Sequence, residues 1–323
     1  AIFDPRALVA ENRVIVVSVT YRLGLFGYLA TGTGRPANLG LLDQLEAFRW
    51  VQRNISAFGG DPGNVTAFGQ SAGGDAVAHL MATPEAPTLF RRAIIQSAPL
   101  GITRGRDKMS RAMGVAAEAV TEDTPAMDVV EIEGHVSQVA RKFGLIAAMP
   151  FGTQYGHAPL PPESGIEAAW NATAAGIEVL IGHTSEEARM FLPRNRAVSR
   201  FAKVPVLGPA AVKAINWAVT EAVYGRSARR FARRHARSGG TAYRYLLSWA
   251  APGNQYGAAH TVDLPLLFGD EQTWAGAGLL EGASWEDING PGKALRALWA
   301  RFASGEGLDD EGVIPGALRY RAV

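Results

Sequence analysis

The stretch Phe68-Gly69-Gln70-Ser71-Ala72-Gly73-Gly74 places one serine between glycines. The residues before it form a short, mostly apolar run typical of a β-strand, and the small and apolar residues after it predict a helix. A G-x-S-x-G pattern at such a strand-to-helix turn is a nucleophile elbow, in which Gly69 and Gly73 leave room for a sharp turn. The turn lifts the Ser71 hydroxyl out of the sheet and points the N–H of Ala72 at the same space. One short element therefore supplies a candidate nucleophile and a candidate oxyanion donor.

Strands and helices alternate along the rest of the chain. Mostly apolar runs predict strands at residues 14–21, 65–68, 92–97, 177–182 and 242–247, and the first of these runs is rich in β-branched residues. Helical patterns cover residues 38–58, 72–81 and 294–302, and two more helices are expected within 208–237. The run 14–21 is typical of a strand buried on both faces, and Asn38 is expected to cap the helix that follows it. The alternation indicates an α/β fold with a mostly parallel central sheet, right-handed crossovers and helices on its faces.

The chain reads as a single domain over residues 1–323. Its 323 residues, of which 47% are hydrophobic, are sufficient for a packed core. Residues 104–150 are polar, charged and helical in character, which predicts a helical cap inserted over the sheet. Three prolines make residues 151–165 a loop.

Composition excludes several classes of function. The chain has 32 lysines and arginines and 30 acidic residues, which gives a formal net charge of +2. A net charge this small does not favour nucleic acid or a membrane surface as a partner. The chain has no cysteine, which excludes disulfides, thiolate metal sites and a cysteine nucleophile. No apolar run approaches the roughly 18 residues of a membrane span. The basic segment 226–237 reads as a solvated helix face rather than a nucleic-acid site, because no aromatic interleaving accompanies it. We expect a bacterial cytoplasmic protein that needs no metal or organic cofactor.

A serine hydroxyl needs a base to take its proton, and after such an elbow the partners follow in the order serine, acid, histidine. The chain has six histidines: His79, His135, His157, His183, His235 and His260. His260 follows the predicted strand 242–247 through a Gly/Pro loop, where catalytic side chains tend to lie in α/β sheets. His235 belongs to the basic segment, and the other four are expected to be packing or surface residues. His260 is therefore the candidate base.

The acid is expected on a loop that follows a core strand between the serine and the histidine. Glu186 and Glu187 both follow the predicted strand 177–182. An acid at this place would hold the tautomer of the imidazole and stabilise the imidazolium as it forms. The residues themselves leave the choice between the two glutamates open.

Several blocks resemble the type-B carboxylesterases, which include the bacterial p-nitrobenzyl esterases and are similar to the cholinesterases. These blocks are Tyr21-Arg22-Leu23-Gly24, Asn38-Leu39-Gly40-Leu41-Leu42-Asp43-Gln44, Phe58-Gly59-Gly60-Asp61-Pro62 and Gly69-Gln70-Ser71-Ala72-Gly73. Weaker matches continue through residues 181–187, 258–269 and 298–302. Gln70 stands where many members carry glutamate, which is a mild departure. The resemblance implies the α/β-hydrolase fold.

The resemblance also assigns residues. It implies Glu187 as the acid, supports His260 as the base, and places Ser97 as a further hydroxyl near the triad, with Gln70 beside the nucleophile. It implies a structural ion pair between Arg22 and Asp43, without chemistry.

The resemblance further implies that a His-Gly-Gly loop, which completes the oxyanion hole in the family, precedes the first block. The chain contains no such loop, so Ala72 is the remaining candidate donor. We expect the chain to represent roughly two-thirds of a complete enzyme, without its first strands. The implied function is a serine carboxylic-ester hydrolase that forms an acyl-enzyme on small to medium apolar esters. The alternatives are a catalytically silent binding relative, as in neuroligin-like proteins, and a fragment that is inactive because the loop is missing.

Overall fold

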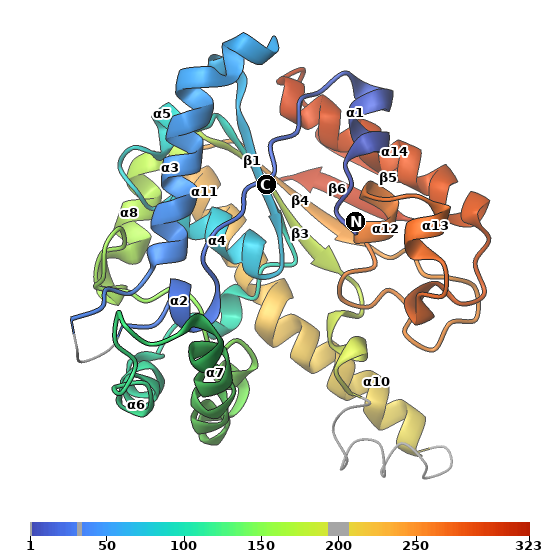
Figure 1. Ribbon diagram of the computed structural model, residues 1–323. Coiled ribbons are helices and arrows are strands. Elements are labelled where there is room, and N and C mark those ends of the chain that lie inside the picture. The colour runs from blue at the N-terminus through green and yellow to red at the C-terminus, as the bar shows by residue number, and fades with distance from the viewer. Residues whose placement is uncertain (1, 31–33, 193–206) are drawn as a thin grey trace.

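The computed structural model describes residues 2–30, 34–192 and 207–323. Within these residues, six strands form one central sheet in the order β1-β2-β3-β4-β6-β5 (Figure 1). Strands β1 (Thr66–Gln70), β2 (Arg92–Gln96), β3 (Glu178–Thr184) and β4 (Ala242–Leu247) are parallel. The hairpin of β5 (Glu311–Ile314) and β6 (Leu318–Ala322) joins β4 in antiparallel fashion. The sheet is therefore mostly parallel, as predicted.

Helices cover both faces of the sheet (Figure 1). The α-helices of the described ranges are α1 (Arg6–Asn12), α2 (Gly24–Gly27), α3 (Leu39–Asn54), α4 (Ala72–Leu80), α5 (Ala86–Leu89), α6 (Asp107–Ala116), α7 (Ala126–Ala140), α8 (Ile166–Thr173), α10 (Leu207–Thr220), α11 (Arg226–Arg237), α12 (Leu264–Leu267), α13 (Glu271–Trp274) and α14 (Trp285–Ser304). Helices α3, α4, α8 and α11 lie on one side, and α1, α12 and α14 lie on the other.

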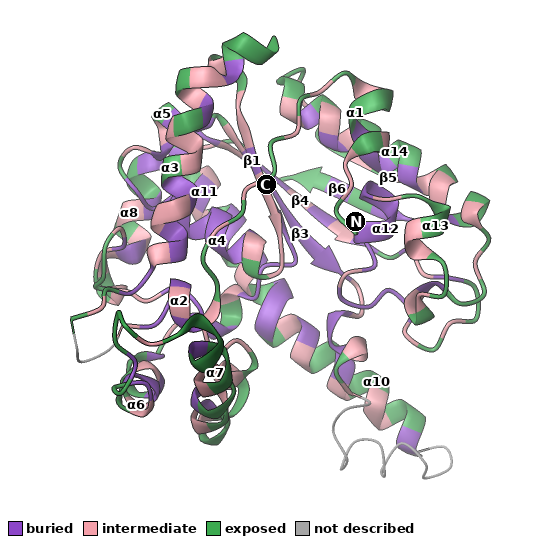
Figure 2. Cartoon of the chain, viewed as in Figure 1, coloured by how far each residue is buried: buried purple, intermediate pink, exposed green. Residues whose placement is uncertain are grey.

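Side chains of the central strands alternate between two cores, because successive residues of a strand point to opposite faces. Ala93 and Ile95 of β2 pack in the core beneath α3, α4 and α11, whereas Ile94 packs in the core beneath α14. In β3, Ile181 and Leu180 divide in the same way. Figure 2 shows β3 buried along its length between the two helical layers. A rigid, doubly covered sheet thus supports the loops at the ends of its strands.

The predicted strands at 65–68, 92–97, 177–182 and 242–247 are confirmed as β1 to β4, with ends within two residues. The predicted helices at 38–58 and 72–81 are confirmed as α3 with a following 3₁₀ turn (Ile55–Phe58) and as α4. The prediction for 208–237 is confirmed as α10 and α11, which a π-helical turn (Glu221–Gly225) joins without a break.

The predicted strand at residues 14–21 is wrong. The segment joins no strand, and its residues are exposed or half-buried rather than buried on both faces. Val14 and Val16 pack against the core beneath α14, while Ile15 and Val17 point outward. A β-branched run forms a strand only where a neighbour completes its hydrogen-bond ladder. The edge strand β1 pairs with β2 alone in the described part of the chain, so the segment lacks that neighbour.

The basic segment 226–237 is not simply a solvated face. It forms α11, whose buried side includes Phe231 and His235. The His235 Nε2–H donates to the carbonyl of Ile177 at 2.7 Å. The guanidinium of Arg234 lies 4.4 Å from the ring centroids of both Trp170 and Phe231. Because half of the residues of α11 are arginines, its narrow buried side is difficult to recognise in the sequence.

Residues 104–150 are helical, as predicted. They contain α6, α7 and a 3₁₀ segment (Arg141–Ala148), and they share a separate apolar cluster with Leu25 and Leu29. Their role as a cap over the site stays a prediction, as does the single-domain reading of residues 1–323. No helix of the described ranges has both the length and the apolar content of a membrane span.

The predicted pairing of Arg22 with Asp43 is confirmed as a contact. The guanidinium donates from Nη2 to Asp43 Oδ1 at 2.6 Å and from Nε to Oδ2 at 2.8 Å, and the Arg22 backbone N–H donates to Oδ2 at 3.0 Å. The pair ties the end of the 14–21 segment to α3.

Candidate active site

The serine sits at the turn between β1 and α4. Ser71 has φ 58° and ψ −119°, a region that residues with a side chain adopt only under constraint. Its backbone N–H donates to the carbonyl of Gln96 at 2.8 Å, which fastens the turn to β2. The strained geometry is the one expected of a nucleophile elbow.

The two glycines that this turn requires are Gly69 and Gly74. A Cβ on Gly69 would lie 2.5 Å from the carbonyl carbon of Gly73, and a Cβ on Gly74 would lie 2.8 Å from the carbonyl oxygen of Gln96. A Cβ on Gly73 would meet nothing within 4 Å. The expectation that Gly73 leaves room for the turn is therefore wrong: its space is open, and Gly74 makes the close approach to the neighbouring strand.

This contrast gives a matched pair of variants. We expect Gly69→Ala to lower the free energy of unfolding by about 3 kcal/mol, since a methyl group there overlaps backbone that cannot move away. Gly73→Ala should keep or slightly raise stability, because alanine favours the helix by up to about 1 kcal/mol. Urea unfolding of both variants measures the difference, and equal losses would contradict the account of the turn.

Three predicted site residues come together in one hydrogen-bonded chain. The hydroxyl of Ser71 lies 2.8 Å from His260 Nε2, and His260 Nδ1 lies 2.5 Å from Glu187 Oε2. A carboxylate only accepts, so Nδ1 carries the proton and Nε2 is free to accept from the serine. The other carboxylate oxygen, Oε1, accepts the backbone N–H of Thr184 at 2.7 Å. The structure thus joins Ser71, His260 and Glu187 across 189 and 73 residues of sequence.

Burial and charge act in opposite directions on the two ionisable members. Burial raises the pKa of the Glu187 carboxyl, but the charge of His260 and the hydrogen bonds from His260 and from the Thr184 N–H lower it below its usual range. Burial lowers the pKa of His260, while the charge and hydrogen bond of Glu187 and the charge of Asp263 raise it above its usual value. The pair therefore favours a charged carboxylate next to an imidazole that accepts a proton readily.

The remaining predicted site residues lie around this chain. Gln70 Nε2 is 3.5 Å from His260 Nε2, a distance too long for a strong hydrogen bond. Ser97 is buried with φ 49° next to Glu187, although its Oγ does not meet hydrogen-bond geometry with a described residue. Ala72 is exposed at the first position of α4, where backbone N–H groups are free to bind an anion.

Two aromatic rings lie near the histidine, and sequence reasoning missed one of them, Tyr224. The His260 ring centroid lies 5.4 Å from that of Tyr224 and 5.6 Å from that of Phe191. Tyr224 comes from the π-helical turn, a feature often found at functional sites but without a signature in this sequence.

A buried carboxyl, Asp263, also escaped the sequence analysis. It accepts from Gln96 Nε2 at 2.7 Å, and Gln96 Oε1 accepts from Trp299 Nε1 at 3.3 Å. Burial, together with the charge of Glu187, raises the pKa of Asp263 to about 6. The sequence feature that could have pointed to Asp263 is its position three residues after His260, the candidate base.

Asp263 should therefore make stability depend on pH. A carboxyl whose pKa is higher in the folded than in the unfolded chain binds more protons when folded, so stability falls as pH rises between the two values. From about pH 4 to pH 8 we expect the free energy of unfolding to fall by about 2 kcal/mol relative to Asp263→Asn, whose amide oxygen still accepts from Gln96. Urea unfolding of both proteins at the two pH values measures this, and a constant difference would contradict it.

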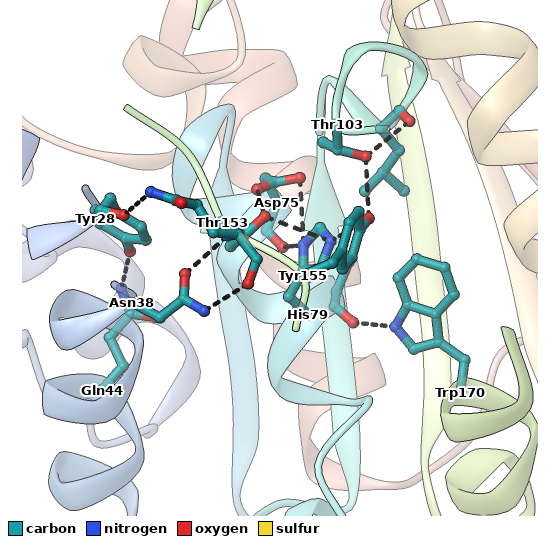
Figure 3. A network of polar contacts seen from close by, with 12 residues as sticks. Tyr28, Asn38, Gln44, Asp75, His79, Thr103, Thr153, Tyr155 and Trp170 are labelled. Atoms are coloured by element: carbon teal, nitrogen blue, oxygen red, sulfur yellow. Dashed lines mark hydrogen bonds and ion pairs between the residues drawn. The ribbon is translucent and has the colours of Figure 1, made fainter. Parts of the chain in front are cut away.

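A second polar network is centred on Asp75 and His79 of α4, the helix that follows the nucleophile (Figure 3). His79 is fully buried; its Nδ1 donates to the carbonyl of Asp75 at 2.7 Å, and its Nε2 lies 2.9 Å from the hydroxyl of Tyr155. Burial lowers the pKa of His79, but the charges and hydrogen bonds of Asp75 and Tyr155 outweigh it and raise the pKa to about 10. The network anchors α4 to the 151–165 loop.

Asn38 extends this network. It stands at the N-cap position of α3, but the prediction that its side chain caps the helix is wrong, because it makes no capping hydrogen bond. Its Nδ2 donates to the carbonyls of Gln154 and His157 at 2.8 and 3.0 Å, and its Oδ1 accepts the Gln154 N–H at 2.8 Å. Long-range contacts thus replace the local cap.

A mostly parallel sheet with a serine at a strand-to-helix elbow, and a histidine and a glutamate on loops after later strands, defines an α/β hydrolase. Solved structures agree: a thermophilic p-nitrobenzyl esterase aligns with 98% of this chain and 70% of its own length, at a TM-score of 0.77 and 28% identity. A model described as the carboxylesterase family matches residues 1–204. The chain belongs to the carboxylesterase family and is a carboxylesterase enzyme.

Curated relatives support this placement. A probable N-octanoylanthranilate hydrolase, AqdA2, from Rhodococcus erythropolis is 38% identical over 309 residues, 93% of this chain and 67% of that protein. The para-nitrobenzyl esterase of Bacillus subtilis (strain 168) is 31% identical over 83% of this chain and 60% of its own length. The chain thus spans about two thirds of the length of these relatives.

Proposed function

We propose that this protein hydrolyses carboxylic esters through an acyl-enzyme on Ser71. The observation that carries the proposal is the hydrogen-bonded chain from Ser71 Oγ through His260 to Glu187, at 2.8 and 2.5 Å. A serine, a base and an orienting carboxylate in this order are the groups that acyl transfer requires. Membership of the carboxylesterase family supports ester hydrolysis as the overall reaction.

In the first half-reaction, Ser71 Oγ attacks the ester carbonyl carbon while its proton moves to His260 Nε2. The Glu187 carboxylate stabilises the imidazolium that forms, and the N–H of Ala72 donates to the oxyanion. Collapse breaks the bond to the alcohol oxygen, which takes the proton from His260. In the second half-reaction His260 takes a proton from water, the hydroxide attacks the acyl carbonyl, and Ser71 leaves with that proton. The products are one alcohol and one acid.

We infer a small to medium apolar ester as the substrate. Phe191 is 42% exposed beside His260, so an apolar acyl or alcohol group near the triad would contact an aromatic ring. The name of the Rhodococcus relative also points to an N-acyl aromatic amine as a second substrate class. Amides share the acyl-enzyme route but have a poorer leaving group. Parallel assays with p-nitrophenyl octanoate and N-octanoylanthranilate separate the two classes.

The test of the acyl-enzyme is a pre-steady-state assay with p-nitrophenyl acetate. We expect a burst of nitrophenol near one equivalent, and an acetyl group on the peptide that contains Ser71. Ser71→Ala should show neither. A folded wild-type chain without burst and without acylation would contradict the proposal and support one of the two alternatives, a silent relative or a fragment that is inactive because the loop is missing.

The same assay at several pH values tests the base. His260 must be neutral to accept the serine proton, and its pKa is raised by Glu187. The acylation rate should therefore increase with pH, with a midpoint above the ordinary histidine value of about 6.5. A midpoint below that value would contradict the role of the Glu187 contact.

A further inference from the structure

The loop that carries His260 contains turns but no regular element until α12 begins at Leu264. The base nevertheless has to lie within hydrogen-bond distance of both Ser71 and Glu187. Something outside the loop has to hold its backbone in place. Glu186, the glutamate that is not part of the triad, makes hydrogen bonds that can fix the backbone of this loop.

Glu186 makes two hydrogen bonds to one residue of this loop. Its backbone N–H donates to the carbonyl of Ala258 at 3.0 Å, and its carboxylate Oε2 accepts the Ala258 N–H at 3.1 Å. The carboxylate thus binds the backbone two residues before the base. Ala258 and Ala259 are themselves buried, so their backbone groups depend on partners within the protein.

The position of the Glu186 carboxylate is fixed from two further sides. Arg189 Nη1 donates to its Oε1 at 2.7 Å. Gly257, at φ 56°, lies directly against it: a Cβ there would be 2.1 Å from Glu186 Oε2 and 2.5 Å from Arg189 Nη1. The carboxylate therefore occupies the space that a side chain at residue 257 would need.

The next residue binds the other end of the same loop. Glu187 accepts the His260 backbone N–H at its carbonyl at 3.3 Å and the imidazole Nδ1 at its carboxylate. Two consecutive glutamates after β3 thus bind the same loop. Glu186 binds the backbone of Ala258, and Glu187 binds the imidazole of His260. A shift of Ala258 would move His260 relative to Glu187 and to Ser71.

We propose that Glu186 is a positioning residue that fixes the His260 loop through the backbone of Ala258. The proposal rests on the proposed function, since it assumes that His260 is the base. A mere surface ion pair with Arg189 would contribute little. A displacement of the base by about 1 Å can cost about 10²-fold in rate, so loss of the hold should be visible in catalysis.

The test compares Glu186→Ala, Glu186→Asp and Glu186→Gln with Glu46→Ala, which removes an exposed carboxylate paired with Arg49 and Arg53 far from the loop. The readout is the rate at which a fluorophosphonate modifies Ser71. We expect Glu186→Ala to be at least tenfold slower and Glu186→Asp, which shortens the reach, several-fold slower. Glu186→Gln, whose amide oxygen can still accept from Ala258, and Glu46→Ala should stay within threefold of the wild type.

A pH profile separates positioning from a loss of stability. The pKa of His260 is raised by Glu187 and also by Asp263, so it depends on where the imidazole lies. In Glu186→Ala the midpoint of the labelling profile should move toward about 6.5, while Glu186→Gln keeps the wild-type midpoint. A merely structural role would lower the unfolding midpoint and leave the pH midpoint unchanged.

Wild-type rates and midpoints in Glu186→Ala and Glu186→Asp would overturn the proposal. Proton NMR keeps the test independent of catalysis, since the far-downfield signal of the His260 Nδ1 proton reports its contact with Glu187. If the wild type shows this signal but does not react, the proposed function fails. The positioning role is then judged by whether Glu186→Ala, or Glu186→Asp should the alanine variant not fold, shifts that signal and Glu186→Gln preserves it.

Discussion

Replacing His260 with alanine is expected to reduce the acylation of Ser71 by about 10⁶-fold, because the serine then has no acceptor for its proton. The hydroxyl of Ser71 donates to His260 Nε2 at 2.8 Å and has no second hydrogen-bond partner among the described residues. Stopped-flow release of p-nitrophenol measures the rate. His157→Ala is a suitable control, because His157 bonds to Asn38 through its carbonyl only.

The fold should survive this change, since the imidazole packs near two aromatic rings but supports no strand. Circular dichroism and urea unfolding check that point. A variant that is folded and keeps more than a hundredth of the wild-type rate would contradict the assignment of His260 as the base.

Replacing Glu187 with glutamine is expected to cost about 10³–10⁴-fold in the acylation rate. The carboxylate can only accept from His260 Nδ1, whereas an amide can also donate, which favours the tautomer with its proton on Nε2. That tautomer cannot accept the serine proton. Glutamine also lacks the charge that stabilises the imidazolium, so the pKa of His260 should fall.

The matched control for this variant is Glu186→Gln, one residue earlier on the same loop. We expect it to stay within threefold of the wild-type rate, because the amide oxygen of glutamine can still accept the Ala258 N–H and the residue does not contact the imidazole. Equal losses in the two variants would contradict the separate roles of the glutamates.

The elbow could be predicted from the sequence because it rests on a local pattern. The order serine, acid, histidine could be predicted because it belongs to the fold that such an elbow indicates. A serine between glycines at a strand-to-helix turn has few structural solutions, and the mostly apolar runs of β2, β3 and β4 lie in a sheet buried on both faces. The choice between Glu186 and Glu187 needed the family resemblance, since both follow the same strand. The structure separates them by which one reaches His260.

Other features depend on contacts that no local pattern encodes. Residues 14–21 have strand composition but lack a neighbouring strand, and α11 hides an apolar side among its arginines. The buried carboxyls Asp75 and Asp263 accept hydrogen bonds from residues far away in sequence, Thr153 and Gln96 respectively. The cap role of residues 104–150, the partners and the bacterial cytoplasmic location stay predictions.

The central claim is that Ser71 is an activated nucleophile. The most direct test is to treat the protein with a fluorophosphonate and to determine its intact mass, with Ser71→Ala in parallel. If Ser71 is activated, the wild type carries a single adduct, located on the peptide that contains Ser71, and the variant carries none. A folded wild type without an adduct, or an adduct that persists in Ser71→Ala, would contradict it.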